Sequence, residues 1–138
     1  MKAHKLFLAL VILALPTVFQ SCEPVEGNPN LSGTWTCKET SQIFMKRATL
    51  TSTFTVTFIR DAVNPDQYYI QNFYKLGDQV KVSVLKDGYT ITIPQQSVDG
   101  FVFAGSGSIN ENYTLINMTY TADDGGGQVD NVVAEMSR

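Results

Sequence analysis

Hydrophobic and polar residues alternate most clearly between residues 80 and 94. Two alternating runs flank Asp87-Gly88, a dipeptide that readily adopts the positive φ angles of a tight hairpin turn. A two-residue loop at this point places the aliphatic side chains of both runs on one face. The pattern therefore predicts an antiparallel hairpin that buries one face. The predicted pairs are Lys86 with Tyr89, Val84 with Ile91 and Val82 with Ile93.

The same two-residue period recurs along the chain. In residues 50–60, Phe54, Val56 and Phe58 share the inward face and four threonines share the other. Further strands are expected at residues 31–38, 67–74, 101–109 and 129–136, with turns or loops at 61–66, 95–100 and 123–127. Residues 42–50 fit either a short helix or a loop across one barrel end. We count eight or nine strands and no long helix.

These elements predict an all-β, antiparallel up-and-down barrel of about eight strands. We expect a filled interior, because most inward residues are bulky and apolar. If Gly105 and Gly107 instead leave space beside Tyr68 and Tyr120, an apolar ligand fits there. A two-residue turn at 111–112 would set Gly107 against Ile116 and Gly105 against Met118. The inward set is Trp35, Phe54, Val56, Phe58, Val82, Val84, Ile91, Ile93, Phe101 and Phe103.

The first 21 residues have the pattern of an export signal. Lys2 and Lys5 precede an unbroken apolar run at residues 6–15, which is short for a permanent membrane span. The segment ends at Ser21-Cys22 and resembles a bacterial lipoprotein signal, which implies lipidation of Cys22 and a membrane anchor. The alternative is an ordinary secretory signal cleaved near Ser21. Residues 22–30 are then a flexible tether and residues 31–138 the domain.

Charge and histidine content exclude several functions. The chain has a net charge of −3, and removal of the leader takes away two lysines, which argues against binding to nucleic acid or anionic lipid. The single histidine, His4, lies in the leader, so the domain has no imidazole for acid–base catalysis or zinc. Cys37 is interpreted as a small buried apolar residue.

Gly33-Thr34-Trp35 at the head of the domain resembles the opening of the lipocalin and avidin superfamily, the calycins. The resemblance implies a lipocalin-like barrel in which an arginine, here Arg138, packs over Trp35 where the barrel closes. The chain is also similar to small lipocalin-like lipoproteins of Gram-negative anaerobes, which implies an outer-membrane location. The ligand-binding residues expected on this basis are Trp35, Phe54, Phe58, Tyr68, Phe103 and Tyr120.

Other candidate sites match their motifs poorly. The acidic turn at residues 123–127 with Asp130 lacks the spacing of a calcium loop. Residues 104–108 lack the helix and the Lys-Ser/Thr pair of a phosphate loop, and Gly-x-Ser-x-Gly is absent. The remaining acids lie mostly at predicted turns, where solvated charge is the usual state. We therefore expect no catalytic residue, metal or cofactor.

The sequence predicts a non-enzymatic, lipid-anchored barrel of the bacterial envelope that binds a small apolar ligand or a partner protein. The alternative is a structural or accessory lipoprotein with a filled core, which acts through an exposed face such as Tyr69, Phe73 and Leu85. A hydrolase that uses two carboxylates is the third hypothesis.

Overall fold

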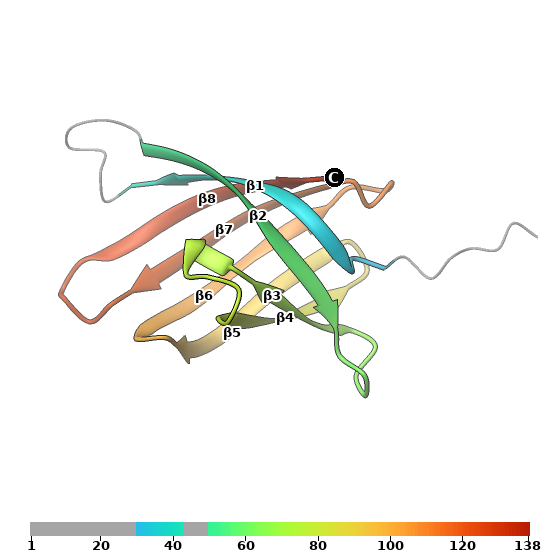
Figure 1. Ribbon diagram of the computed structural model, residues 1–138, viewed down its shortest axis with the longest axis horizontal. Coiled ribbons are helices and arrows are strands. Elements are labelled where there is room, and N and C mark those ends of the chain that lie inside the picture. The colour runs from blue at the N-terminus through green and yellow to red at the C-terminus, as the bar shows by residue number, and fades with distance from the viewer. Residues whose placement is uncertain (1–29, 43–49) are drawn as a thin grey trace, which may run out of the picture.

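The computed structural model describes residues 30–42 and 50–138, in which eight antiparallel strands form one closed barrel in chain order. Each strand pairs with its neighbours in sequence, and the last strand returns to pair with the first, Met136 opposite Cys37. The predicted all-β, up-and-down barrel is confirmed (Figure 1). Its strands are β1 (Gly33–Ser41), β2 (Leu50–Arg60), β3 (Gln67–Gln71), β4 (Lys81–Asp87), β5 (Thr90–Val98), β6 (Phe101–Ile109), β7 (Leu115–Asp123) and β8 (Val129–Ser137).

The predicted leader, the tether with Cys22 and most of the segment 42–50 lie outside the described residues. β1 ends at Ser41, just before this last segment, and β2 begins at Leu50, the final residue of the segment. Within the described ranges, no helix is long and apolar enough to cross a membrane.

Alternate side chains of the strands point inward and form one core. Val82, Val84, Ile91 and Ile93 are buried as predicted, and each such side chain contributes about 1.5–3 kcal/mol through removal from water. Phe54, expected on the same inward face as Val56 and Phe58, is only partly buried. The interior is thus packed with side chains along most of its length.

The predicted register of the β4–β5 hairpin is wrong by two residues. Asp87 pairs with Thr90 and Lys86 with Ile91, so the loop is Gly88-Tyr89 rather than Asp87-Gly88. Gly88 takes the positive φ angle, +57°, as the first central residue of the turn. A shift of two residues preserves the faces, since side chains alternate with a period of two. The burial prediction therefore holds although the pairing differs.

The β6–β7 pairing also differs by two residues from the prediction. Gly107 lies opposite Met118 and Gly105 opposite Tyr120, while Ile109 faces Ile116. The connection is longer than two residues because the Asn110 side chain organises it: its Oδ1 accepts hydrogen bonds from the backbone N–H groups of residues 114 and 115, at 2.8 and 2.9 Å. Small residues still face large ones, as expected.

β3 ends at Gln71, three residues earlier than predicted. Asn72 adopts a left-handed conformation (φ +58°), and the chain continues into the short 3₁₀ turn η2 (Phe73–Lys75). This turn moves Phe73 from the predicted outer face into the core, where it is fully buried. The prediction that Tyr69, Phe73 and Leu85 share an exposed face is therefore wrong for Phe73, which is buried.

β5 extends to Val98 through residues predicted as a loop. Pro94 cannot donate a ladder hydrogen bond, and the register with β6 shifts between Ile93 and Gln96. The Gln96 side chain replaces the missing bonds to β4: it donates to Ser83 O (2.7 Å) and accepts from Ser83 N (2.9 Å). A side-chain amide thus keeps the sheet continuous beside the proline.

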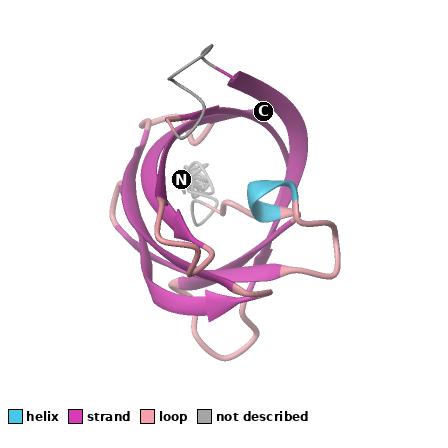
Figure 2. Cartoon of the chain, turned by 90° about the vertical axis from the view of Figure 1, so that its left-hand side faces the viewer, coloured by secondary structure: helices cyan, strands magenta, loops and turns pink. Residues whose placement is uncertain are grey.

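The two ends of the barrel differ in what covers them. One end, which we call the terminal end, holds Asn30, the start of β1 and the C-terminus (Figure 1). The other, the η2 end, holds η2 and the β5–β6 and β7–β8 turns. Figure 2 looks onto the η2 end and shows η2 lying within the ring of strands. The polar groups described next gather at this end.

Candidate ligand site

Glu39 places a carboxylate inside the barrel near its η2 end. The alternation along β1 that buries Trp35 and Cys37 also turns Glu39 inward, and only 6% of this residue is exposed. Its Oε1 accepts a 2.5 Å hydrogen bond from the Tyr120 hydroxyl and a 3.8 Å contact from the Cys37 thiol. β1 and β7 therefore position a buried carboxylate with two donors on one oxygen.

Burial perturbs all three members of this group. Removal from water raises the pKa of Glu39 from near 4.5 to about 7, and the nearby charge of Asp130 adds to the rise, while the bonds from Tyr120 and Cys37 oppose it. The pKa values of Tyr120 and Cys37 are also raised, first by burial and then by the Glu39 charge. The carboxyl of Glu39 thus changes protonation near neutral pH, whereas the phenol and thiol stay protonated.

Asp130, on β8, is the second buried carboxylate, 1% exposed. It accepts hydrogen bonds from Ser41 Oγ (2.6 Å), from the backbone N–H of Gln42 (3.1 Å) and from the Tyr74 hydroxyl (2.8 Å). These donors come from β1, the residue after it and η2. Asp130 therefore joins three segments at the η2 end.

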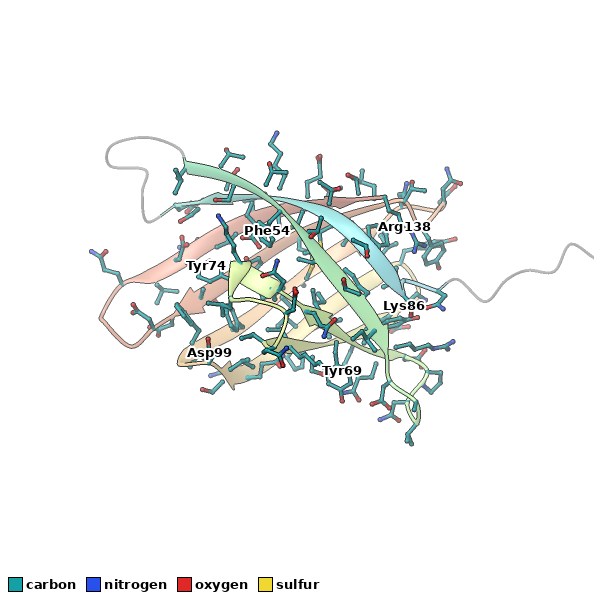
Figure 3. The ribbon with its side chains drawn as sticks, in the orientation of Figure 1. Phe54, Tyr69, Tyr74, Lys86, Asp99 and Arg138 are labelled. Carbon is teal, nitrogen blue, oxygen red and sulfur yellow. The ribbon has the colours of Figure 1, made fainter. Side chains whose placement is uncertain are left out.

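Tyr74 is held in an unfavourable backbone conformation. Its φ is +54°, and neighbouring Asn72 and Lys75 also have positive φ, which side chains with a Cβ rarely adopt. The bond to Asp130 and ring contacts to Phe101 and Phe103, with centroids 5.5 and 5.9 Å away, fix the side chain, which lies beside η2 (Figure 3). Such conformations persist where the surroundings fix them, often at functional sites.

Aromatic rings form the floor beneath these polar groups. Phe73 packs on Phe103 with an edge-on geometry at 5.3 Å and on Tyr120 at 4.6 Å between ring centroids. All three residues are buried, Phe73 and Phe103 completely. The site is therefore a polar group above an apolar floor, which separates it from the rest of the core.

A pocket of about 120 Å³ opens above Glu39. Every polar side-chain atom that is buried in the described part of the chain has a hydrogen-bond partner, yet both bonds to Glu39 reach Oε1. Oε2 is consequently open to the pocket. Pockets for drug-sized ligands measure about 300–1,000 Å³, so this one suits a small group. Its lining residues are Glu39, Ser41, Leu50, Ser52, Tyr74 and Val132.

The ligand-binding residues expected from sequence fall into two groups. Phe103 and Tyr120 belong to the floor of this site. Trp35, Phe58 and Tyr68 lie toward the terminal end: Trp35 packs on Phe58 (5.6 Å between centroids), and the Tyr68 hydroxyl reaches Asn30 Oδ1 at 3.4 Å. Phe54 packs partly buried against the core. The six residues therefore do not line one pocket.

The residues expected at the barrel closure lie together at the terminal end. The Arg138 guanidinium stands over the Trp35 ring, 4.4 Å from its centroid. It also donates to three backbone carbonyl oxygens, those of Tyr113 (2.9 Å), Ser32 (3.2 Å) and Asn30 (3.0 Å). Gly33 begins β1 with φ +123°. Arg138 therefore contacts both the residues that lead into β1 and the connection between β6 and β7.

Sequence reasoning missed the three polar residues of the site. Glu39 follows Trp35 and Cys37 at intervals of two, and this spacing could have placed it inside the barrel. Asp130 falls in the strand predicted at residues 129–136, but from the sequence it is considered only as a calcium ligand beside the acidic turn, whereas it faces inward as the second residue of β8. Tyr74 reaches the site only because β3 stops early, and no sequence signal reveals that.

Two shallow depressions lie on the outer surface of the barrel. Both, of about 280 and 290 Å³, follow the outward small side chains of β6 and β7 and border Val133. Neither contains a buried charge from the described residues. They lack the convergent polar groups seen at the η2 end.

Fold and site together define a closed, eight-stranded antiparallel β-barrel with a buried carboxylate open to a small pocket at one end. No protein-family model matches the chain, and no curated protein is significantly similar to it in sequence. The described residues contain no group of three or more histidine, cysteine, aspartate or glutamate side chains that could hold a metal ion.

Proposed function

We propose that this protein is a lipid-anchored, lipocalin-like binding protein of the bacterial envelope, without enzymatic activity, that holds a small ligand at the η2 end. The observation that carries the proposal is the pocket above Glu39, where a carboxyl oxygen inside a closed barrel remains open to a ligand. A buried ionisable group costs stability and has a perturbed pKa, and such groups are concentrated at functional sites.

Kinship with the lipocalins is supported by the terminal end. Gly33-Thr34-Trp35 opens the first strand, and Arg138 lies over the Trp35 ring. An eight-stranded closed barrel is compatible with this family, although other families share the architecture. The proposed ligand site differs from the apolar site considered beside Gly105 and Gly107, because side chains fill the interior and the pocket lies at its edge.

The proposed anchor attaches to the barrel at the end opposite the pocket. Cys22 would carry the lipid, and residues 22–30, at most ~3.5 Å each, would reach about 30 Å. This tether joins the barrel at Asn30, whose carbonyl Arg138 holds at the terminal end. The η2 end would thus be free of the attachment point, and a dissolved ligand could reach it.

The bonding of Asp130 favours binding over catalysis. Hydrolysis by two carboxylates needs both groups to act on the substrate. Asp130 instead accepts hydrogen bonds from Ser41, Gln42 and Tyr74, so its role is to hold these segments together. Of the two buried carboxylates, only Glu39 lines the pocket.

Mass spectrometry of protein extracted from the native membrane tests the anchor. We expect loss of residues 1–21 and a mass increase from acyl chains on Cys22, and release of the protein from membranes in the Cys22→Ala variant. Cys37→Ala, which changes the buried second cysteine, is the matched control and should remain anchored. An unacylated N-terminus elsewhere in the chain would contradict the proposal.

A second candidate function is that of a structural or accessory lipoprotein that binds a partner through its outer surface. It is favoured by the packed interior and by the outer depressions beside Val133, which is 49% exposed. Val133→Glu should then abolish partner crosslinking in intact cells, whereas Glu39→Gln should not. Loss of crosslinking in Glu39→Gln but not in Val133→Glu would instead favour binding at the pocket.

A further inference from the structure

We propose that the pocket at the η2 end selects a small organic ammonium ion, whose N–H groups donate to Glu39 Oε2, Ser41 Oγ and Tyr74 Oη. This inference rests on the proposed binding function and specifies the chemistry of its ligand. It follows from the direction of the hydrogen bonds around the pocket.

Ser41 and Tyr74, two of the three hydroxyl-bearing residues that line the pocket, already donate their hydroxyl protons to the protein, and the third is Ser52. Ser41 Oγ donates to Asp130 Oδ2 at 2.6 Å, and the Tyr74 hydroxyl donates to the same oxygen at 2.8 Å. A hydroxyl that donates its one proton offers only lone pairs to a further partner. Tyr120 likewise donates to Glu39 Oε1. The oxygens of Ser41 and Tyr74 can therefore act only as acceptors toward a ligand.

Glu39 adds the charge that these acceptors lack. Only 6% of the Glu39 residue is exposed, both of its hydrogen bonds reach Oε1 and leave Oε2 toward the pocket, and no lysine or arginine of the described residues bonds to it. An ammonium group presents several donors and a positive charge, so it satisfies all three acceptors at once. A neutral alcohol has one proton to donate, and a carboxylate ligand would meet like charge.

The surrounding rings suit the organic part of such a ligand. Tyr74 lines the pocket, and its ring packs against Phe101 and Phe103. Leu50 and Val132 supply further apolar surface. Aromatic faces attract organic cations more than they attract neutral groups. A pocket of about 120 Å³ accepts the ammonium end, and a longer ligand would extend from the opening.

Protonation of Glu39 should couple ammonium binding to pH. The groups that face it are Cys37 from its own strand, Tyr120 from β7, Asp130 from β8 and Tyr74 from η2. With a pKa of about 7, Glu39 is mostly charged near pH 8 and mostly neutral near pH 6. Affinity for a permanently charged ammonium ligand should fall roughly tenfold between these two values.

Three probes with the same ring test the inference: benzylammonium, benzyl alcohol and benzoate. Each is titrated into the full lipidated protein in detergent micelles near pH 8, and NMR shifts of residues at the η2 end give the dissociation constants. Benzylammonium should bind at least about tenfold more tightly than the other two, a difference of about 1.4 kcal/mol. Glu39→Gln should remove this preference, whereas Glu135→Gln, which removes an exposed carboxylate on β8, should retain it.

The outcomes separate the inference from the function on which it rests. Equal or tighter binding of benzyl alcohol or benzoate overturns the ammonium inference and leaves a ligand pocket at this end. If none of the probes shifts residues at the η2 end, both the inference and the pocket function are overturned. A preference for benzylammonium that survives Glu39→Gln assigns the selectivity to another group and also overturns the inference.

Discussion

A carboxylate inside a β-barrel loses its hydration, and Glu39 recovers only part of that loss. Two donors bind one of its oxygens, and the other oxygen depends on whatever fills the pocket. The cost appears as a raised pKa, because the neutral acid is easier to bury than the charged form. Ligand binding and folding stability are therefore linked at this residue.

Glu39 should make the protein less stable as pH rises toward neutrality. Its folded-state pKa of about 7 exceeds the unfolded value near 4.5, so the folded state binds the proton more tightly. The resulting stabilisation is complete below about pH 4.5, declines as pH rises, and is lost above about pH 7. The shift corresponds to about 3 kcal/mol.

Glu39→Gln keeps an oxygen that accepts from Tyr120 but cannot ionise. Urea unfolding should therefore show a flatter pH profile for this variant between about pH 5 and 7.5, and greater stability than wild type near pH 8. If the free energy of unfolding changed equally with pH in the two proteins, Glu39 would not have a raised pKa.

Gly105 meets the neighbouring strand too closely for any side chain. A Cβ at this position would overlap the Thr119 carbonyl oxygen and the Tyr120 Cβ. We expect Gly105→Ala to cost about 1–3 kcal/mol by overpacking, measured by urea unfolding. Ser106→Ala, at an exposed position on the same strand, is the control and should change stability by less than about 0.5 kcal/mol. A neutral Gly105→Ala would contradict the close packing of β6 on β7.

Among the structural elements, β1 depends on the C-terminal residue for its closure. Arg138 lies over the Trp35 ring and donates to two backbone carbonyls just before β1 and to one between β6 and β7. Arg138→Ala should cost about 1–2 kcal/mol and speed amide exchange at the start of β1. Lys86→Ala, which removes a looser cation 5.5 Å from the Tyr113 ring, should have a smaller effect. Unchanged exchange in Arg138→Ala would show that strand pairing alone closes the barrel.

The turn η2 contains a conformational cost that glycine can relieve. Lys75 is exposed and has φ +60°, a region that costs an L-residue about 1–2 kcal/mol. Lys75→Gly should consequently raise the free energy of unfolding by about 0.5–1 kcal/mol. Lys81→Gly, at an exposed position in β4, should lower it by a similar amount. Destabilisation by both substitutions would contradict the positive φ at residue 75.

The limits of sequence reasoning are visible in these same elements. Alternation predicted which residues of β4 and β5 face inward, because burial repeats with the period of the strand. It could not fix the hairpin registers, since a shift of two residues preserves every face. It also could not predict the end of β3, because the left-handed Asn72 is held by bonds to Thr55 O and Gly77 N. Tyr74 went unpredicted because it reaches the site through that turn, whereas the two-residue spacing along β1 could have revealed the inward position of Glu39.

At the scale of the whole molecule, the two ends of the barrel have separate roles in the proposed account. The terminal end joins the tether and is held by Arg138. The η2 end carries the buried carboxylates, the strained turn and the pocket. This polarity predicts that ligand access does not require detachment from the membrane. Binding of benzylammonium should therefore be equal, within about twofold, for lipidated protein in vesicles and for the Cys22→Ala variant in solution. Loss of binding in vesicles would contradict this arrangement.

The most direct test of the account is the titration of the Glu39 carboxyl carbon, followed by ¹³C NMR in the full-length protein and assigned by comparison with Glu39→Gln. We expect a midpoint near pH 7, which moves lower when benzylammonium is added because the bound cation favours the charged form. A midpoint below about pH 5, unaffected by the probe, would contradict a buried carboxylate that is open to a ligand.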